Sequence, residues 1–162
     1  MKKPVVSIVM GSKSDLYLAK NCASVLEEFG VGYELRVLSA HRSPKATASF
    51  AQKAGQRKIK VIIAFAGGAA HLAGVIASHT ILPVIGVPVK TTVLKGIDSY
   101  LSTLQMPGGV AVATMSIGKA GAKNAAILAV QILGISDARL KKKIVQYKKK
   151  LAQGVLASGL TI

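Results

Sequence analysis

The chain has 162 residues, of which 51% are hydrophobic and only 4% aromatic, and it carries 22 Lys and Arg against 6 Asp and Glu. This length suits one globular domain, whose core has to be built from aliphatic residues and Ala, as in helices packed on a parallel sheet. The formal net charge of +16 predicts long-range attraction of anions. Because the charge does not choose among nucleic acid, an acidic membrane face and a small phosphorylated metabolite, the motifs have to decide.

Several features argue against secretion and against a membrane span. The apolar run at residues 5–10 is too short for a signal peptide and leads into charged residues. The uncharged stretch between Lys60 and Lys90 is interrupted by Gly, His and Pro, which divide it into short elements. The lone Cys22 cannot form an intrachain disulfide and is typical of buried packing in a reducing compartment. We therefore expect a cytoplasmic protein without a membrane association.

Strands and helices are expected to alternate along the chain. Apolar, β-branched runs predict buried strands at residues 5–10, 33–38 and 61–65, and the stretches between them predict helices at 16–29 and 44–54. Farther along, the pattern predicts short helices at 72–79 and 98–104 and further strands at 84–87 and 110–114. Such alternation implies an open parallel sheet with right-handed crossovers and helices on both faces.

The C-terminal part is expected to be helical, at residues 119–133 and 137–156. In the last helix, apolar residues recur at spacings of three and four and form a seam surrounded by lysines, which requires a partner surface. The seam comprises Leu140, Ile144, Tyr147, Leu151 and Val155. We expect one domain over residues 1–162, with a core at 1–135 and a C-terminal helical extension at 136–162.

Ligands of open parallel sheets bind at the carboxyl ends of the strands, which directs attention to three loops. The first, residues 11–15 (Gly-Ser-Lys-Ser-Asp), has hydroxyls before a helix and can hold an anion there. The alternative is that Ser14 or Asp15 only caps the helix. The loop is neither a Walker nor a dinucleotide-binding motif.

The second loop, residues 39–44 (Ser-Ala-His-Arg-Ser-Pro), combines chemistry with a helix start. Ser43 is a suitable N-cap and Pro44 suits the first helical position. Arg42 can bind a phosphate with its forked donors, and His41 can exchange protons near neutral pH. The alternative is a surface charge beside an ordinary loop histidine.

The third loop, residues 67–71 (Gly-Gly-Ala-Ala-His), lets a flat ligand approach the backbone and ends in His71. Its alternative is tight strand-to-helix packing, which small residues also serve. His79, farther along, is interpreted as a packing or surface residue. Together the three loops favour a binding site. No Cys/His spacing predicts zinc and no paired carboxylates are apparent, so we expect no metal.

These motifs together resemble the PurE family, that is, 5-(carboxyamino)imidazole ribonucleotide mutases and the related aminoimidazole ribonucleotide carboxylases. The Gly-Gly-Ala-Ala-His loop resembles the mutase branch. Departures from the family pattern are Ala73, Phe65 and the pair Gly108 and Gly109, which affect the expected stiffness of the loops. The resemblance covers almost the whole chain, in blocks at residues 10–15, 39–44, 66–72, 83–89, 98–99, 105–107 and 120–126.

The resemblance implies a flavodoxin-like α/β/α sandwich with a sheet of about five strands. It also implies a homo-octamer with shared active sites, in which the C-terminal helix packs on neighbouring subunits. The implied activity is cofactor-free transfer of a carboxylate from the exocyclic nitrogen to ring carbon 4 of a purine precursor, with His41 as the acid/base. Further implied site residues are Ser12, Ser14, Ser39 and Arg42 for the phosphate, Asp15 for the ribose, and Gly68, Ala69, Ala70 and His71 for the imidazole and carboxylate.

Two other functions remain open at this point. One is direct carboxylation of aminoimidazole ribonucleotide by CO2, as in the other branch of the family. The other is a basic nucleic-acid-binding module, suggested by the lysine runs at residues 141–143 and 148–150. The scarcity of aromatic residues argues against it, because base stacking needs aromatic platforms, so we expect no obligatory nucleic acid partner and a small nucleotide as substrate.

Overall fold

A computed structural model describes residues 2–157. Five parallel strands form one sheet in the order β2-β1-β3-β4-β5, which is the flavodoxin-like order. The strands are β1 (Val6–Met10), β2 (Tyr33–Val37), β3 (Val61–Gly67), β4 (Val84–Val89) and β5 (Ala113–Thr114). The predicted fold class and the alternation of strands and helices are therefore confirmed.

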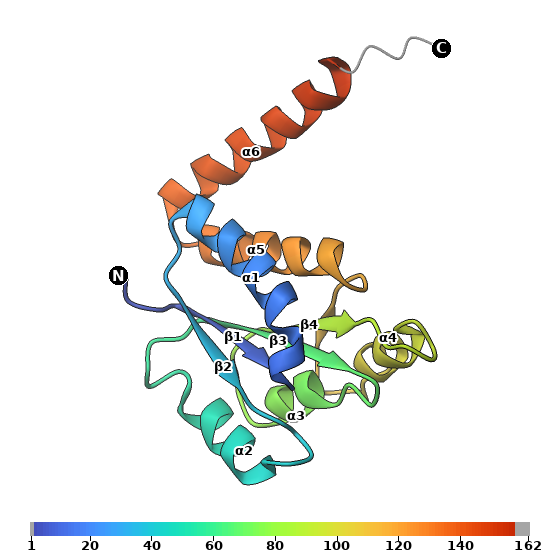
Figure 1. The fold of residues 1–162 in the computed structure, drawn as a ribbon. Coiled ribbons are helices and arrows are strands. Elements are labelled where there is room, and N and C mark those ends of the chain that lie inside the picture. The colour runs from blue at the N-terminus through green and yellow to red at the C-terminus, as the bar shows by residue number, and fades with distance from the viewer. Residues whose placement is uncertain (1, 158–162) are drawn as a thin grey trace.

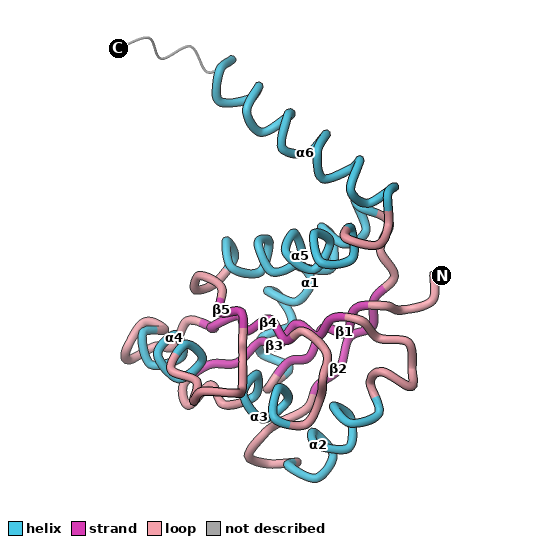
Figure 2. Tube along the Cα trace, turned by 180° about the vertical axis from the view of Figure 1, so that it is seen from behind, coloured by secondary structure: helices cyan, strands magenta, loops and turns pink. Residues whose placement is uncertain are grey.

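Helices cover both faces of the sheet (Figures 1 and 2). A 3-10 turn, η1 (Lys13–Asp15), leads into α1 (Leu16–Phe29), which packs beside α5 (Lys119–Gly134) on one face. The opposite face carries α2 (Pro44–Lys53) and α3 (Leu72–Ser78), while α4 (Ile97–Leu104) lies at the β4–β5 side. The two faces enclose two apolar clusters, one under α1 and α5 and the other under α2 and α3.

Burial along the strands follows their place in the sheet. All residues of β1 and β4 are buried, as are the first six of β3, including Phe65. Strand β2 was predicted to be buried, and this is wrong: it lies at the sheet edge, where Leu35 and Val37 are exposed. The predicted strand at 110–114 is reduced to two residues, because β5 pairs with β4 only at Ile85 and Gly86.

The last helix, α6 (Ala138–Ala157), extends away from the sheet (Figure 1). Its first half is anchored: Ile144 is buried, and Tyr147 packs edge-on against Phe29 with ring centroids 5.5 Å apart. Farther along, Leu151 is half exposed and Leu156 is 80% exposed. The predicted apolar seam is thus covered by the same chain only in its first half.

Two further predictions concern Cys22 and the membrane. Cys22 is fully buried in the cluster under α1, and burial raises the pKa of its thiol to about 12, so the thiol stays protonated near neutral pH. Within residues 2–157, none of the helices has the length and apolar character needed to cross a bilayer.

Candidate active site

The three predicted loops meet at the carboxyl ends of β1, β2 and β3, around a cavity of about 410 Å³. The sheet order explains why they meet. Strand β1 lies between β2 and β3, so the crossovers leave β1 and β3 toward opposite sides and create a topological switch point. The cavity is lined by Gly11, Ser12, Ser14, Asp15, Ser39, Ala40, His41, Arg42, Ala66, Gly67, Ala69 and Leu72.

The first loop is tied to the neighbouring strand and to itself. The Gly11 amide donates to the Phe65 carbonyl oxygen of β3 at 3.0 Å, which continues the sheet by one residue. The Ser12 hydroxyl oxygen accepts from the Ser14 amide at 3.3 Å and so caps the 3-10 turn. Asp15 stands at the start of α1 but makes no side-chain cap bond. Its carboxylate is therefore not used as a helix cap.

Asp15 is an unusual carboxylate because it is only 6% exposed yet lines the cavity. Burial raises its pKa, and hydrogen bonds from the Ser14 side chain and the Ser12 backbone lower it only in part. The Ser14 hydroxyl donates to Asp15 Oδ1 at 3.2 Å. A buried carboxylate facing a cavity is suited to accept hydrogen bonds from hydroxyl groups of a ligand.

The second loop is held by a network around Ser39. The Ser39 carbonyl oxygen accepts from the hydroxyls of Ser43 at 3.0 Å and Thr47 at 3.2 Å, and the Ser39 amide donates to Ser43 Oγ at 3.0 Å. Ser43 does precede α2 and Pro44 does begin it, as predicted. The predicted side-chain cap is wrong, however, because the Ser43 hydroxyl is engaged with Ser39.

Arg42 connects the first two loops. Its Nη2 donates to the Gly11 carbonyl oxygen at 3.1 Å, while its amide and Nε donate to Ser39 Oγ at 3.1 and 3.4 Å. Because Ser39 Oγ acts as acceptor in these bonds, its own hydrogen remains free to donate to a ligand. Arg42 is exposed at the cavity and brings a positive charge beside two serine hydroxyls, a combination suited to phosphate.

His41 connects the second and third loops. Its Nε2 lies 2.9 Å from Nδ1 of His71, and the two rings meet edge to face with centroids 5.0 Å apart. His71 also lines an adjoining hollow of about 390 Å³ with Leu101, Ser102 and Met106. His79 is exposed at the end of α3, away from this pair.

The third loop is held by Ser99 of α4, which was not among the predicted site residues. Ser99 of α4, which is fully buried, accepts from the Gly68 amide at 2.9 Å and donates to the Val89 carbonyl oxygen at 2.7 Å. Gly68 has a φ of 66°, a left-handed conformation that favours glycine. Residues 98–99 belong to the blocks that carry the family resemblance, and this was the only signal for Ser99 in the sequence.

Seven of the ten predicted site residues line the cavity, and His71 joins them through His41. Gly68 and Ala70 do not line it: the Gly68 amide is bound by Ser99, and Ala70 is buried in the cluster under α3. The departures Ala73 and Phe65 are both buried in the core, and Gly109 stands in an exposed turn with a φ of 92°. In the described part of the chain, no three His, Cys, Asp or Glu side chains gather as a metal cluster would require.

Comparison with known proteins decides the family. The AIR carboxylase family model matches residues 5–154. This chain belongs to the AIR carboxylase family. Within this family it is 54% identical to an N5-carboxyaminoimidazole ribonucleotide mutase of Pyrococcus horikoshii, over 95% of this chain and 86% of that protein.

Two further relatives extend the comparison. A mutase of the same name from Bacillus subtilis is 53% identical over 97% of both chains. The crystal structure of Treponema denticola PurE superposes with a TM-score of 0.88 at 31% identity, covering 98% of this chain and 99% of that one. The resemblance predicted from the sequence blocks is therefore confirmed.

Proposed function

We propose that this member of the AIR carboxylase family is an N5-carboxyaminoimidazole ribonucleotide mutase of purine biosynthesis, an isomerase that forms 4-carboxy-5-aminoimidazole ribonucleotide. Relatives with this name share 50–54% of its residues over almost the whole chain. The observation that carries the assignment to this site is the gathering of Asp15, Arg42 and His41 around one cavity, with His71 bonded to His41.

The substrate phosphate is proposed to bind between the first two loops. Arg42 provides the positive charge, and the hydroxyls of Ser12 and Ser39 line the cavity as hydrogen-bond donors. The Ser14 hydroxyl, which donates to Asp15 in this structure, is proposed to turn toward the phosphate when the substrate binds. Asp15 would then accept hydrogen bonds from the ribose hydroxyls. This order places the imidazole near His41 and the third loop, where Ala69 and His71 are proposed to contact the ring and its carboxylate, while Gly68 and Ala70 hold the loop in place.

The reaction needs two proton transfers, one to the exocyclic nitrogen and one from carbon 4. Breaking the bond between the exocyclic nitrogen and its carboxylate releases CO2 and leaves a nitrogen that takes up a proton. After carbon 4 attacks CO2, that carbon carries both a hydrogen and the new carboxylate, and loss of the proton restores the aromatic ring. We assign both transfers to His41, which donates the first proton and accepts the second, so that protons balance over the cycle.

Released CO2 has to stay beside the ring between the two steps. The cavity wall near His41 consists of small and apolar residues, including Ala66, Ala69 and Leu72. Such a wall keeps water away from the released CO2, which favours its attack by carbon 4 over its escape. These residues need no metal or cofactor for the steps assigned to them.

A homo-octamer in the cytoplasm, with active sites shared between subunits, is part of the proposal. Support comes from α6, whose far half presents exposed apolar residues such as Leu151 and Leu156. Support also comes from His41 and His71, which are exposed in the single chain although CO2 has to be retained there. A neighbouring subunit would cover both features.

Substrate feeding tests the function. Purified protein receives either the carboxyamino compound, or aminoimidazole ribonucleotide with bicarbonate, and formation of the 4-carboxy product is followed in each case. The mutase assignment predicts a much higher kcat/KM for the carboxyamino compound. Faster conversion of aminoimidazole ribonucleotide with CO2 would instead place the protein in the carboxylase branch. Light scattering of the same preparation measures the oligomer.

A further inference from the structure

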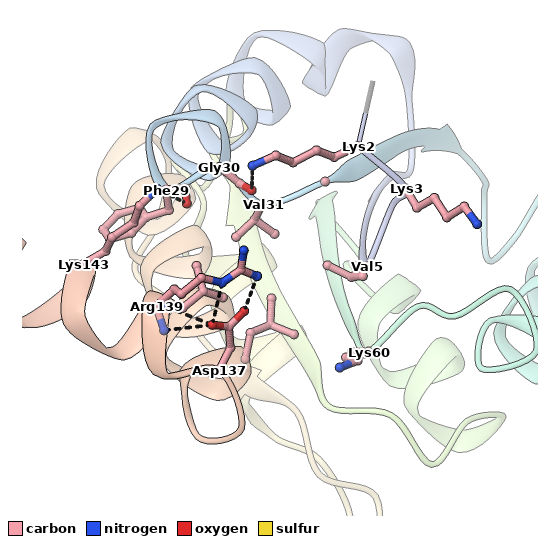
Figure 3. Close-up of a pocket in the computed structure, with 13 residues that line it drawn as sticks. Lys2, Lys3, Val5, Phe29, Gly30, Val31, Lys60, Asp137, Arg139 and Lys143 are labelled. Atoms are coloured by element: carbon pink, nitrogen blue, oxygen red, sulfur yellow. Dashed lines mark hydrogen bonds and ion pairs between the residues drawn. The ribbon is translucent and has the colours of Figure 1, made fainter.

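A second cavity, of about 280 Å³, lies at the amino ends of the strands (Figure 3), whereas the active site lies at their carboxyl ends. It is enclosed by the segment before β1, the turn between α1 and β2, the residue before β3 and the start of α6. All three strands thus meet this cavity with their amino ends. A five-residue strand separates the two by roughly 16 Å, so the cavity is not an extension of the substrate site.

The rim of this cavity is strongly positive. Five cationic side chains line it, against a single carboxylate, Asp137. That carboxylate is already occupied: Arg139 Nη2 contacts Asp137 Oδ2 at 3.1 Å, and Asp137 Oδ1 accepts from the amides of Arg139 and Leu140 at the start of α6. The cations are Lys2, Lys3, Lys60, Arg139 and Lys143.

Two of the lysines have a structural role that leaves donors unused. Lys2 Nζ donates to the Gly30 carbonyl oxygen at 2.7 Å, and Lys143 Nζ donates to the Phe29 carbonyl oxygen at 2.8 Å. Both bonds satisfy the C-terminus of α1. An ammonium has three hydrogens, so each group retains two for a ligand.

The other two lysines have no such role. Within residues 2–157, the ammonium groups of Lys3 and Lys60 have neither a hydrogen-bond nor an ion-pair partner. Both residues line the cavity and precede neighbouring strands, Lys3 before β1 and Lys60 before β3, and Figure 3 shows the Lys3 side chain extending outward from the rim. Collecting like charges around a hollow costs energy through mutual repulsion, and a bound anion relieves that cost.

The inner wall of the cavity is apolar. Phe29, Val31 and Leu133 are almost completely buried and line it together with Val5 and Leu140. A cationic rim over an apolar wall differs from a surface that only attracts ions, because the wall gains contact with an apolar part of a ligand. The charges select a polyanion, and the wall selects one that carries a ring or other apolar group.

We propose that this cavity is a second ligand site, which binds an organic anion bearing at least two phosphate groups. The phosphates bind among the lysines of the rim, which supply the unused hydrogens of Lys2 and Lys143 and the charges of Lys3 and Lys60, while the ring or apolar group packs against Phe29 and Val31. This site would account for part of the +16 net charge of the chain. Among the residues that line the substrate cavity, only Arg42 carries a positive charge.

Calorimetric titration of the full chain with ADP, without added magnesium, tests the site. We expect Lys3→Gln/Lys60→Gln to weaken ADP binding by about tenfold to a hundredfold, the effect of losing charge-assisted hydrogen bonds. The matched control is Lys20→Gln/Lys53→Gln, which removes the same charge from exposed lysines of α1 and α2 outside both cavities. This control should change the Kd by less than about threefold. Inorganic pyrophosphate, which lacks the apolar group, should bind at least tenfold more weakly than ADP.

Each contrary result overturns a defined part of the proposal. Absence of ADP binding to the parent protein, or an equal loss in the control pair, means that the charges only attract ions generally. Loss of ADP binding in Arg42→Ala but not in Lys3→Gln/Lys60→Gln places ADP in the substrate cavity. Pyrophosphate binding as tightly as ADP removes the role of the apolar wall. None of these outcomes depends on mutase turnover, so the proposed function stands or falls separately.

Discussion

His41 Nε2 and His71 Nδ1 lie 2.9 Å apart, so the two imidazoles share a single hydrogen between them. When His41 carries a proton on Nε2, Nδ1 of His71 has to be the acceptor, and the His71 hydrogen then resides on its Nε2. In the reverse arrangement Nδ1 of His71 donates to Nε2 of His41, so the bond couples the tautomers of the two rings and holds their orientation. The partner comes from the third loop, 30 residues away in the sequence.

Replacing His71 tests this dependence. In His71→Leu the hydrogen-bond partner of His41 is lost, and we expect kcat to fall by about tenfold to a hundredfold because the His41 ring is no longer held in one orientation. His71→Asn keeps a polar atom near the position of Nδ1 and should retain more activity than His71→Leu. Steady-state kinetics of both variants measure the difference. Equal activity of the two would show that the hydrogen bond is not needed.

His41 itself should be indispensable for turnover. We expect His41→Asn to bind substrate within a few-fold of the parent protein, because Asp15 and Arg42 are unchanged, while kcat falls by about two to four orders of magnitude. Circular dichroism of the variant controls for folding. Near-normal kcat in a folded variant would remove His41 from the proton transfers.

Much of the fold was predictable because local patterns and parallel-sheet rules agree. The expected bounds of helices α1 to α6 match the structure within one residue, and those of strands β1 to β4 match within two. Burial of β2 was predicted wrongly although the sequence carried a signal: Glu34 and Arg36 interrupt the apolar residues, and charged side chains are typical of an edge strand. The apolar Tyr33, Leu35 and Val37 gave the pattern of a strand but not its place in the sheet.

The site was predictable down to its loops but not to its connections. The residues of loops 11–15 and 39–44 carry recognisable chemistry, and strand order brings them together. The contacts from Arg42 to Gly11 and from Ser99 to Gly68 each join residues 31 positions apart. Serine has no sequence signature for such a buried bridging role, so the resemblance at residues 98–99 marked the position of Ser99 but only the three-dimensional structure shows its contacts.

Ser99 should therefore act as a positioning residue for the third loop. In Ser99→Ala the Gly68 amide loses its acceptor and the Val89 carbonyl oxygen loses its donor, and we expect kcat to fall by about five- to thirtyfold with a smaller change in KM. Ser99→Cys, a weak donor and acceptor, should recover part of kcat. The control is Ser24→Ala, which removes an exposed hydroxyl bond on α1.

Thermal unfolding of the same variants separates positioning from stability. A purely structural Ser99 would lower the Tm without changing kcat below the transition. An unchanged kcat in Ser99→Ala, with or without a lower Tm, would contradict the positioning role.

The ionised Asp15 side chain is expected to lower the stability of the folded protein and to strengthen substrate binding. Burial raises its pKa above the ordinary 3.8, so the folded state holds a proton that the unfolded state has already released. Between 3.8 and the folded pKa, the free energy of unfolding therefore falls as the pH rises, and above that window the buried charge keeps its full cost. Asp15→Asn cannot ionise and should be more stable than the parent protein at pH 7, with the difference shrinking as the pH falls toward 3.8.

The same substitution should impair the enzyme. A neutral amide accepts hydrogen bonds from ribose hydroxyls less strongly than a carboxylate does, so KM is expected to rise by about tenfold or more. Urea unfolding at pH 4 and pH 7, together with KM at pH 7, measures both effects. A variant that is less stable than the parent at pH 7 would show that the hydrogen bonds from Ser14 and Ser12 outweigh the cost of burying the charge. An unchanged KM would separate Asp15 from the substrate.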